Sequence, residues 1–317
     1  MIALFKKRRF NEYLNDTFDF FKKSGKHFLG IYFTINGVFL LLLTVCIYFI
    51  SKVYFEVIFS EINNSGNSNY NYAQTFFTDN FSLIIFGGIA FVILTLLFTL
   101  INFAFPIIYL NEYEKNKGAV FSTGAIFSGL KARAGRLFIF FILSLVVIAP
   151  VLTIVFAILM ALCFIIIGIP LLLIAIPLVF SLMSLTLYHY LNHDDGFFSS
   201  IGKAFNAVFN QFWPIVGSTM IVYMIIQVTM TILSVIPYVI AMIIIFTSAE
   251  TSKTSSADVY SGLGITMTIL FVFTTILHYV FNNLLMVHQG MVYYSRREHI
   301  ENKSSFYEID SIGSHFE

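Results

Sequence analysis

Charged residues are scarce in this chain, and cysteines are nearly absent. Only 11% of the 317 residues are Asp, Glu, Lys or Arg, whereas a soluble domain has about 25%. The 18 basic and 17 acidic residues leave a net charge of +1, so there is no broad cationic field to attract nucleic acid. The two cysteines, Cys46 and Cys163, lie inside apolar runs. No disulfide framework or CxxC metal site is therefore expected.

Catalytic motifs are missing as well. The chain has no Gly-rich phosphate loop, no G-x-S-x-G nucleophile elbow and no HExxH zinc motif. Its apolar runs contain charged residues only near their ends, whereas ion-coupled transporters usually keep an acidic or basic residue in mid-membrane. These absences predict a protein without enzymatic activity or a cofactor of its own, and they argue against a pump or antiporter.

Long hydrophobic runs are what the chain has instead. Hydrophobic residues make up 58% of it and the mean hydropathy is +0.85, which excludes a disordered chain and a soluble enzyme. Six runs reach the roughly 20 residues that a helix needs to cross a bilayer: 28–54, 81–110, 137–167, 170–191, 212–246 and 263–294. The pattern predicts an all-α integral membrane protein with six transmembrane helices. A tight hairpin is expected at Gly168-Ile169-Pro170, because proline disfavours helix at the residue before it.

Basic residues are distributed unevenly around these runs. Sixteen of them fall on the side that holds both chain ends, and only Lys52 and Lys253 fall on the other side. Loops rich in Lys and Arg stay in the cytoplasm, so both termini are predicted to be cytoplasmic. The first run is too long for a signal-peptide core and lacks a small-x-small cleavage site. It is therefore expected to act as an uncleaved signal anchor.

A short motif recurs where spans end, and it indicates an internal repeat. Tyr109-Leu110-Asn111 closes the second run and Tyr190-Leu191-Asn192 closes the fourth. The chain is therefore expected to form one six-span domain over 1–297, made of three units (8–113, 119–193 and 197–297). Each unit would contain an interfacial amphipathic helix followed by a helical hairpin. A cytoplasmic tail, 298–317, would follow the domain.

Three blocks carry apolar residues at helical spacing ahead of the outward spans. The first has Phe10, Tyr13, Leu14, Thr17, Phe18 and Phe21, the second Val120, Phe127, Leu130, Ala134 and Leu137, and the third Phe198, Ile201, Phe205, Val208 and Phe212. An apolar stripe beside a cationic face is typical of a helix in the membrane interface. In the first block Lys22, Lys23 and Lys26 would then contact lipid headgroups. The alternative is that these blocks are extensions of the spans that pack on one another.

Several segments of the chain resemble a known family. They are Phe5-Lys6-Lys7-Arg8-Arg9-Phe10, Asn15-Asp16-Thr17-Phe18, Tyr293-Tyr294-Ser295-Arg296-Arg297-Glu298 and Ile309-Asp310-Ser311-Ile312-Gly313. They are similar to segments of a bacterial six-helix membrane-domain family related to the membrane domain of glycerophosphoryl diester phosphodiesterase, in its Bacteroidetes-type members. The resemblance implies the six-helix fold in a bacterial inner (cytoplasmic) membrane and brings no catalytic residues. No long polar αβ segment remains to encode the soluble phosphodiesterase barrel.

The sixth run carries the most polar face. His278, Asn282 and Gln289 lie within about 40° of each other on a helix, and lipid cannot pair their polar atoms. Candidate partners on other runs are Asn36, Asn102 and Gln227. We expect this face to point into the bundle, where it would either form interhelical hydrogen bonds or border a small polar cavity.

Histidines near the cytoplasmic side are the weak candidates for a metal site. His189 and His193 are one turn apart, Asp194 and Asp195 follow, and His288 lies near the same side of the sixth run. Imidazoles at this spacing can share a metal ion, and carboxylates can complete its shell. Membrane oxygenases repeat such pairs in several boxes, but only one pair occurs here. The alternative is that His189 and His193 are interfacial groups that titrate with solvent.

Together these patterns favour a non-enzymatic membrane protein with a structural or accessory role. It would organise lipid or serve as the scaffold of a membrane complex, with the lipid bilayer and other membrane proteins as partners. One alternative is a transporter or channel for a small neutral or lipidic substrate, for which a cavity bordered by His278 and Asn282 would be evidence. A second alternative is a metal-dependent membrane oxygenase.

Overall fold

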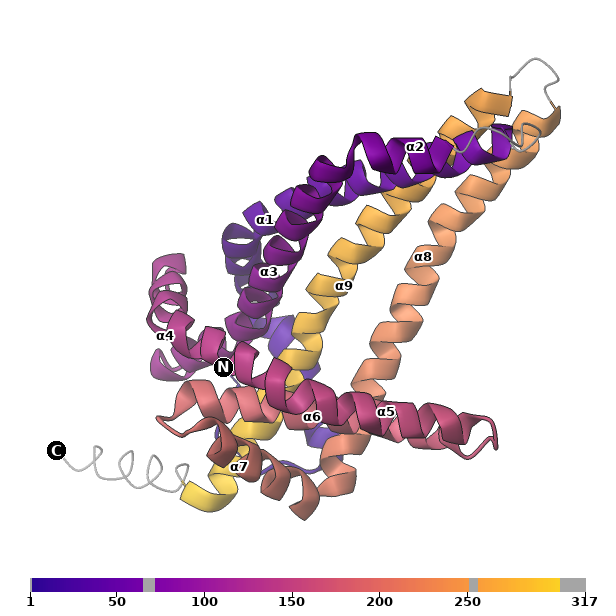
Figure 1. Ribbon diagram of the computed structural model, residues 1–317. Helices are drawn as coiled ribbons and strands as arrows, with labels where there is room; N and C mark the ends of the chain where they lie inside the picture. The colour runs from indigo at the N-terminus through magenta and orange to yellow at the C-terminus, as the bar shows by residue number, and fades with distance from the viewer. Residues whose placement is uncertain (1, 65–71, 251–255, 303–317) are drawn as a thin grey trace, which may run out of the picture. The chain divides into compact units, whose positions relative to one another are not determined.

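Helices are the only regular elements in the part of the chain that the computed structural model describes, residues 2–64, 72–250 and 256–302 (Figure 1). They are α1 (Phe10–Asn64), α2 (Tyr72–Asp79), α3 (Phe81–Lys115), α4 (Thr123–Leu143), α5 (Ala149–Cys163), α6 (Gly168–Asn192), α7 (Phe197–Asn210), α8 (Ser218–Glu250) and α9 (Ser256–Glu301). Two π-helical turns, η1 (Ser144–Ile148) and η2 (Trp213–Gly217), precede α5 and α8. Most of the expected tail lies outside the described residues.

Six helical segments among the described residues are long and apolar enough to cross a membrane. They are Phe10–Phe55, Phe81–Lys115, Thr123–Cys163, Gly168–Asn192, Trp213–Ile240 and Gly264–Glu301. Each overlaps one of the six runs expected from the sequence. The prediction of an all-α membrane protein with six transmembrane helices is therefore confirmed.

The turn between α5 and α6 lies slightly earlier than the sequence predicted. α5 ends at Cys163 and α6 begins at Gly168, so the Gly-Ile-Pro segment opens the second helix. Proline is tolerated in a first helical turn, because the amide hydrogens there have no helical acceptor. A Cβ atom on Gly168 would lie 2.4 Å from the backbone nitrogen of Cys163 and 2.5 Å from the carbonyl oxygen of Leu159. Glycine is therefore required for this close approach.

The chain divides into two compact units, and helices α1, α3, α8 and α9 contribute to both. Unit 1 is drawn from Met1–Ile35, Leu100–Ile225 and Asn282–Glu317, and unit 2 from Asn36–Thr99 and Ile226–Phe281. The repeat units expected from the sequence stay a prediction.

Aromatic side chains fill the interior of unit 1. Phe20 of α1 is fully buried, with its ring centroid 6.1 Å from that of Tyr109 and 5.5 Å from that of Tyr113 on α3. Elsewhere in unit 1, the ring centroid of Tyr188 on α6 lies 5.1 Å from that of Tyr293 on α9. Aromatic pairs at these distances contribute about 0.5–1.5 kcal/mol beyond their burial. These contacts join α1 to α3 and α6 to α9 within unit 1.

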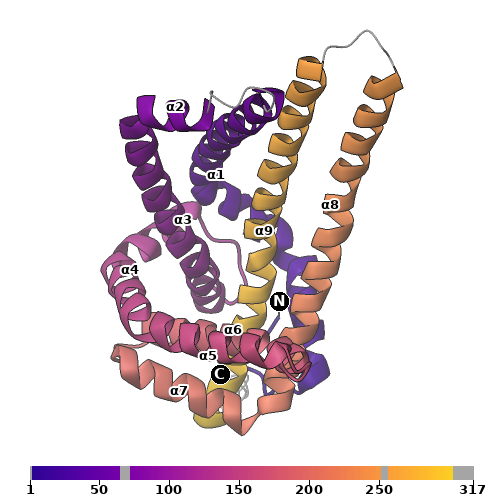
Figure 2. The ribbon, with the colours of Figure 1, turned by 45° about the vertical axis from the view of Figure 1, so that its right-hand side comes forward.

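The first and third amphipathic blocks differ in what they face. The first block is the start of α1, and its stripe residues Tyr13 and Thr17 are buried in the protein. The third block is α7, which lies alongside α6 in both views (Figures 1 and 2). Its stripe residues Phe198 and Phe205 are exposed, but Val208 is fully buried. The second block likewise exposes Val120 and Phe127 and buries Leu137. The second and third blocks therefore present part of their apolar stripes outward, whereas the buried stripe residues of the first block pack on the rest of unit 1.

Unit 2 exposes many of its apolar side chains. Phe98 of α3 is buried, 4.4 Å from the ring of Tyr279 on α9 and 6.1 Å from the ring of Phe39 on α1. Around this contact, large side chains such as Leu83 and Phe86 are exposed. Such surfaces are stable against lipid tails, which are as apolar as the side chains themselves.

Candidate functional site

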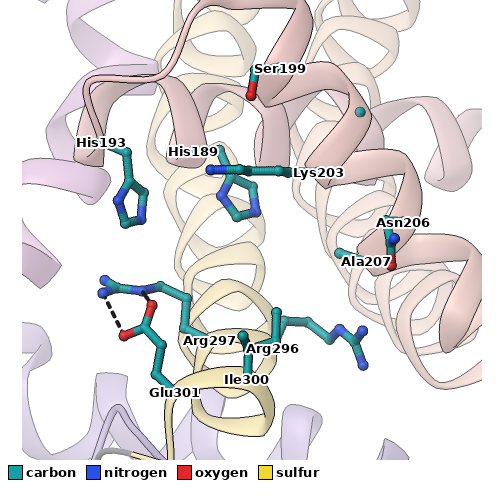
Figure 3. Close-up of a pocket in the computed structure, with 11 residues that line it drawn as sticks. His189, His193, Ser199, Lys203, Asn206, Ala207, Arg296, Arg297, Ile300 and Glu301 are labelled. Carbon is teal, nitrogen blue, oxygen red and sulfur yellow. Dashed lines mark hydrogen bonds and ion pairs between the residues drawn. The ribbon is translucent and has the colours of Figure 1, made fainter.

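A pocket of about 490 Å³ lies in unit 1 where α6, α7 and the end of α9 meet (Figure 3). Its lining consists of His189, His193, Ser199, Gly202, Lys203, Asn206, Ala207, Arg296, Arg297, Ile300 and Glu301. In Figure 3 the two histidines and Lys203 form one wall, and the α9 residues form the opposite wall. The pocket is thus lined mainly by groups that donate hydrogen bonds or carry positive charge.

The local helix geometry places these groups together. His189 and His193 are separated by one turn at the end of α6, with ring centroids 6.2 Å apart. On α7, Ser199, Lys203 and Asn206 follow the i, i+4, i+7 spacing of a single face. The adjacent face of α7 carries Phe198, Phe205 and Phe209, which are exposed, and Trp213 of η2 is exposed as well. One helix therefore lines the pocket and presents aromatic rings outward at the same time.

Arg136 of α4 fixes the end of α6 that carries the histidines. Its Nη2 donates to the carbonyl oxygens of Tyr190 at 2.5 Å, His193 at 2.7 Å and Asp195 at 3.0 Å. Its guanidinium also lies 4.5 Å from the centre of the Tyr190 ring. The last carbonyls of a helix have no helical donor and carry a partial negative charge. A guanidinium is therefore well suited to hold this terminus in place.

Two of the three cations in the pocket are paired with carboxylates. Lys203 Nζ lies 2.5 Å from Asp195 Oδ2. Arg297 donates to Glu301 from both Nε, at 2.8 Å, and Nη2, at 2.9 Å. Arg296 forms no ion pair within the described part of the chain, and its buried Nε has no hydrogen-bond partner there. The pocket therefore keeps one uncompensated guanidinium.

Electrostatics next to the pocket favour a neutral His193 and a charged Asp195. Burial lowers the pKa of His193 below its usual 6.5, and the Arg297 guanidinium lowers it further. The hydrogen bond from Lys203 lowers the pKa of Asp195 below its usual 3.8. His193 Nε2 lies 3.1 Å from the hydroxyl of Tyr293, which holds the ring in place.

The structure does not bring the three candidate metal-binding histidines together. His189 and His193 share the pocket, but His288 is buried elsewhere in unit 1. There its Nδ1 lies 3.2 Å from Thr17 Oγ1 and its Nε2 lies 3.2 Å from Ser218 Oγ. No group of three or more His, Cys, Asp or Glu side chains in the described ranges is arranged to hold a metal ion.

The side chains expected to form one polar face of the sixth run lie in different surroundings. Gln289 is fully buried, and its Nε2 donates to Thr219 Oγ1 at 2.8 Å and to Ser181 Oγ at 3.3 Å. Asn282 is half-buried and His278 is exposed. Burial thus depends on which helices surround each level of α9, because at Gln289 both α6 and α8 are in contact.

The three candidate partners of that face also differ. Asn102 is buried, and its Oδ1 accepts a hydrogen bond from the hydroxyl of Tyr32 at 2.8 Å. Asn36 in unit 2 is fully buried, and neither atom of its amide has a hydrogen-bond partner among the described residues. Gln227 is exposed. A polar cavity shared by all six residues is therefore not formed by these side chains within either unit.

The candidate headgroup contacts on α1 are accessible. Lys22, Lys23 and Lys26 are all exposed, and Lys22 lies 3.6 Å from Asp19 in a surface ion pair. Sequence reasoning did not single out Lys203, Arg296 or Arg297 as site residues. It counted all three among the cytoplasmic charges and quoted Arg296 and Arg297 only within a segment that resembles the family. Arg297 and Glu301 at i, i+4 spacing were the available signal.

Comparisons with known proteins add no relative: no family model, no curated protein and no solved structure matches the chain. The functional argument therefore depends on the residues of this chain alone.

Proposed function

We propose that the protein is a non-enzymatic accessory protein of a bacterial cytoplasmic membrane, and that it organises anionic lipid around itself. The observation that carries this proposal is helix α7, which exposes Phe198, Phe205 and Phe209 on one face and lines a cationic pocket with the adjacent face. An interfacial helix has this combination, because aromatic rings enter the boundary between headgroups and tails while cations meet anionic headgroups.

The proposed orientation places both termini in the cytoplasm. Every basic residue that the sequence assigns to the cytoplasmic side, and that the structure describes, belongs to unit 1. The positions of Lys52 and Lys253 fall in the ranges of unit 2. The unequal division supports the orientation, because cations are retained on the cytoplasmic side of a bacterial membrane. Anionic lipid would then surround unit 1.

Membership of the six-helix family related to the phosphodiesterase membrane domain is part of the same proposal, as are the three repeat units. The family resemblance implies a fold and leaves the activity open. The contribution of this chain's own residues to lipid organisation can be tested directly.

The test is the composition of the lipid that stays with the protein. The full chain would be extracted from a bacterial membrane with a styrene–maleic acid polymer, and its lipids compared with those of the bulk membrane. We expect enrichment of anionic lipid. The Lys22→Glu/Lys23→Glu/Lys26→Glu variant should reduce it, and the matched Lys→Arg triple variant should retain it. A lipid composition equal to that of the bulk membrane would overturn the proposal.

A further inference from the structure

The pocket between α6, α7 and α9 has an excess of positive charge that no described carboxylate offsets. Lys203 and Arg297 are compensated by Asp195 and Glu301, at 2.5 Å and 2.8 Å. Arg296 lines the same pocket without such a partner among the residues that the structure describes. A divalent metal ion would be repelled here, whereas an anion would be attracted.

Two side chains of the pocket lining also carry a nitrogen atom that has no hydrogen-bond partner. Arg296 Nε and His189 Nδ1 are buried atoms, and neither has a hydrogen-bond partner in the described ranges. Because these two atoms have no accessible surface, an occupant of the pocket would meet the outer nitrogens of the same side chains, the Arg296 Nη atoms and His189 Nε2. No hydrogen bond holds those nitrogens within the described ranges, so they are available to an acceptor.

The hydrogen-bond donors of the lining favour a phosphate group among the possible anions. Guanidinium, ammonium, imidazole and hydroxyl groups all donate, and a phosphate group offers several acceptor oxygens in return. The volume of about 490 Å³ exceeds what a bare ion needs. A phosphate that carries a further substituent can therefore be accommodated. Under the proposed function, the exposed rings of α7 would place lipid next to the same helix.

We propose that this pocket is a binding site for a phosphate group, with Arg296 and His189 as its main ligands and Lys203 as a supporting cation. The phosphate could be a free anion or the headgroup of an anionic lipid, since both present the same oxygens. The inference rests on the proposed function, which surrounds unit 1 with anionic lipid, and it adds the residues that hold one phosphate group.

The experiment uses the full chain in nanodiscs of zwitterionic lipid and has two arms. In the first arm, inorganic phosphate is titrated and its binding is followed by calorimetry. In the second, the nanodiscs contain phosphatidate, and native mass spectrometry measures how many phosphatidate molecules remain bound. We expect Arg296→Gln and His189→Gln to weaken binding about tenfold in at least one arm, the usual effect of losing a charge-assisted hydrogen bond. Arg296→Lys should retain part of the affinity.

Lys131→Gln is the matched control, because it removes one exposed cation from α4 outside the pocket. Binding in the first arm only would assign the site to a free anion, and retention in the second arm only would assign it to a headgroup. Equal losses in Arg296→Gln and Lys131→Gln, or no binding in either arm, would overturn the inference. These outcomes differ from failure of the proposed function, which is measured as the lipid composition around the unaltered chain.

Discussion

Asn111 and Asn192, the last residues of the two Tyr-Leu-Asn motifs, are joined by a direct hydrogen bond. Asn111 Nδ2 donates to Asn192 Oδ1 at 2.6 Å, and Asn111 Oδ1 accepts from the hydroxyl of Tyr294 at 2.6 Å. One amide therefore connects α3 to α6 and α9 within unit 1. The recurrence of the motif thus has a structural counterpart, because both copies end at the same junction.

Replacing Asn111 should destabilise the protein more than replacing another asparagine of the same segment. Asn111→Ala removes both interhelical bonds, each worth about 0.6 kcal/mol on average in membrane proteins, and leaves their partners unpaired. We expect a loss of roughly 1–2 kcal/mol in unfolding free energy, measured by steric trapping in lipid. The control is Asn116→Ala, because Asn116 is exposed and its side chain bonds only to the carbonyl of Glu112, four residues earlier. Equal effects of the two substitutions would contradict this role.

Gln289 should matter for stability, whereas His278 should not. Gln289→Leu removes hydrogen bonds to Thr219 and Ser181, and we expect it to cost about 1 kcal/mol. His278→Leu and Gln227→Leu alter exposed side chains and should be nearly neutral. Thermal denaturation in detergent, read as the shift in Tm for the three variants, checks this order. A larger shift for His278→Leu than for Gln289→Leu would show that the face bordered by His278 has a role that its exposure does not explain.

Hydropathy and charge predict the spans well, because crossing a bilayer demands about 20 apolar residues whatever the tertiary fold. Burial inside unit 1 could not be predicted in the same way. Arg8 was counted among the basic residues of the cytoplasmic side, yet it is only 2% exposed. Its Nε donates to Asp16 at 2.8 Å and its Nη1 donates to the carbonyl of Leu4 at 2.6 Å.

The burial of Phe20, an apolar residue, could not be predicted from the sequence either. It falls outside the helical stripe of its block, yet it is fully buried against α3. A stripe predicts one buried face, but a helix packed on several sides buries more than one. The pocket could not be predicted either, because Lys203 and Arg296 are far apart in sequence and only the packing of α7 and α9 brings them together.

Arg136 should control how tightly the end of α6 is held. Arg136→Ala leaves three carbonyl oxygens without their donor, and hydrogen bonds to charged groups are worth about 1.5–3 kcal/mol. We expect faster amide hydrogen exchange over residues 189–200 in this variant. Arg136→Lys should restore slow exchange only partly, because an ammonium lacks the planar set of donors that a guanidinium has. Lys131→Ala on the same helix is the control, and an exchange rate as high as in Arg136→Ala would contradict the prediction.

Replacing Gly168 by alanine should disturb the turn between α5 and α6. Gly168→Ala places a Cβ atom 2.4 Å from the backbone nitrogen of Cys163, so the turn between α5 and α6 must shift. Gly202→Ala meets no atom within 4 Å and should be neutral or slightly stabilising, because alanine favours helix over glycine. The yield of folded protein by size-exclusion chromatography separates the two. Similar yields would show that the turn adapts without cost.

The phosphate pocket should bind anions more tightly in mild acid. His193 is the group whose charge changes, because its pKa lies below 6.5 in the free protein, through burial and the nearby Arg297. A bound anion favours the imidazolium and raises that pKa. Binding then takes up a proton, so affinity increases as the pH falls through the raised pKa and levels off below the pKa of the free protein. Asp195 faces the same histidine but keeps its charge, because Lys203 lowers its pKa.

The measurement is a sulfate titration of the full chain in nanodiscs between about pH 8 and pH 5, a range in which sulfate itself keeps a constant charge. We expect affinity to increase about tenfold for each unit by which binding raises the histidine pKa. His189 and Glu301 also face this ring, so His193→Gln is the decisive variant: it should bind sulfate with little dependence on pH. His278→Gln, which removes an exposed histidine outside the pocket, should retain the full dependence. A wild-type affinity that does not change with pH, or a dependence that persists in His193→Gln, would show that His193 does not take up the proton.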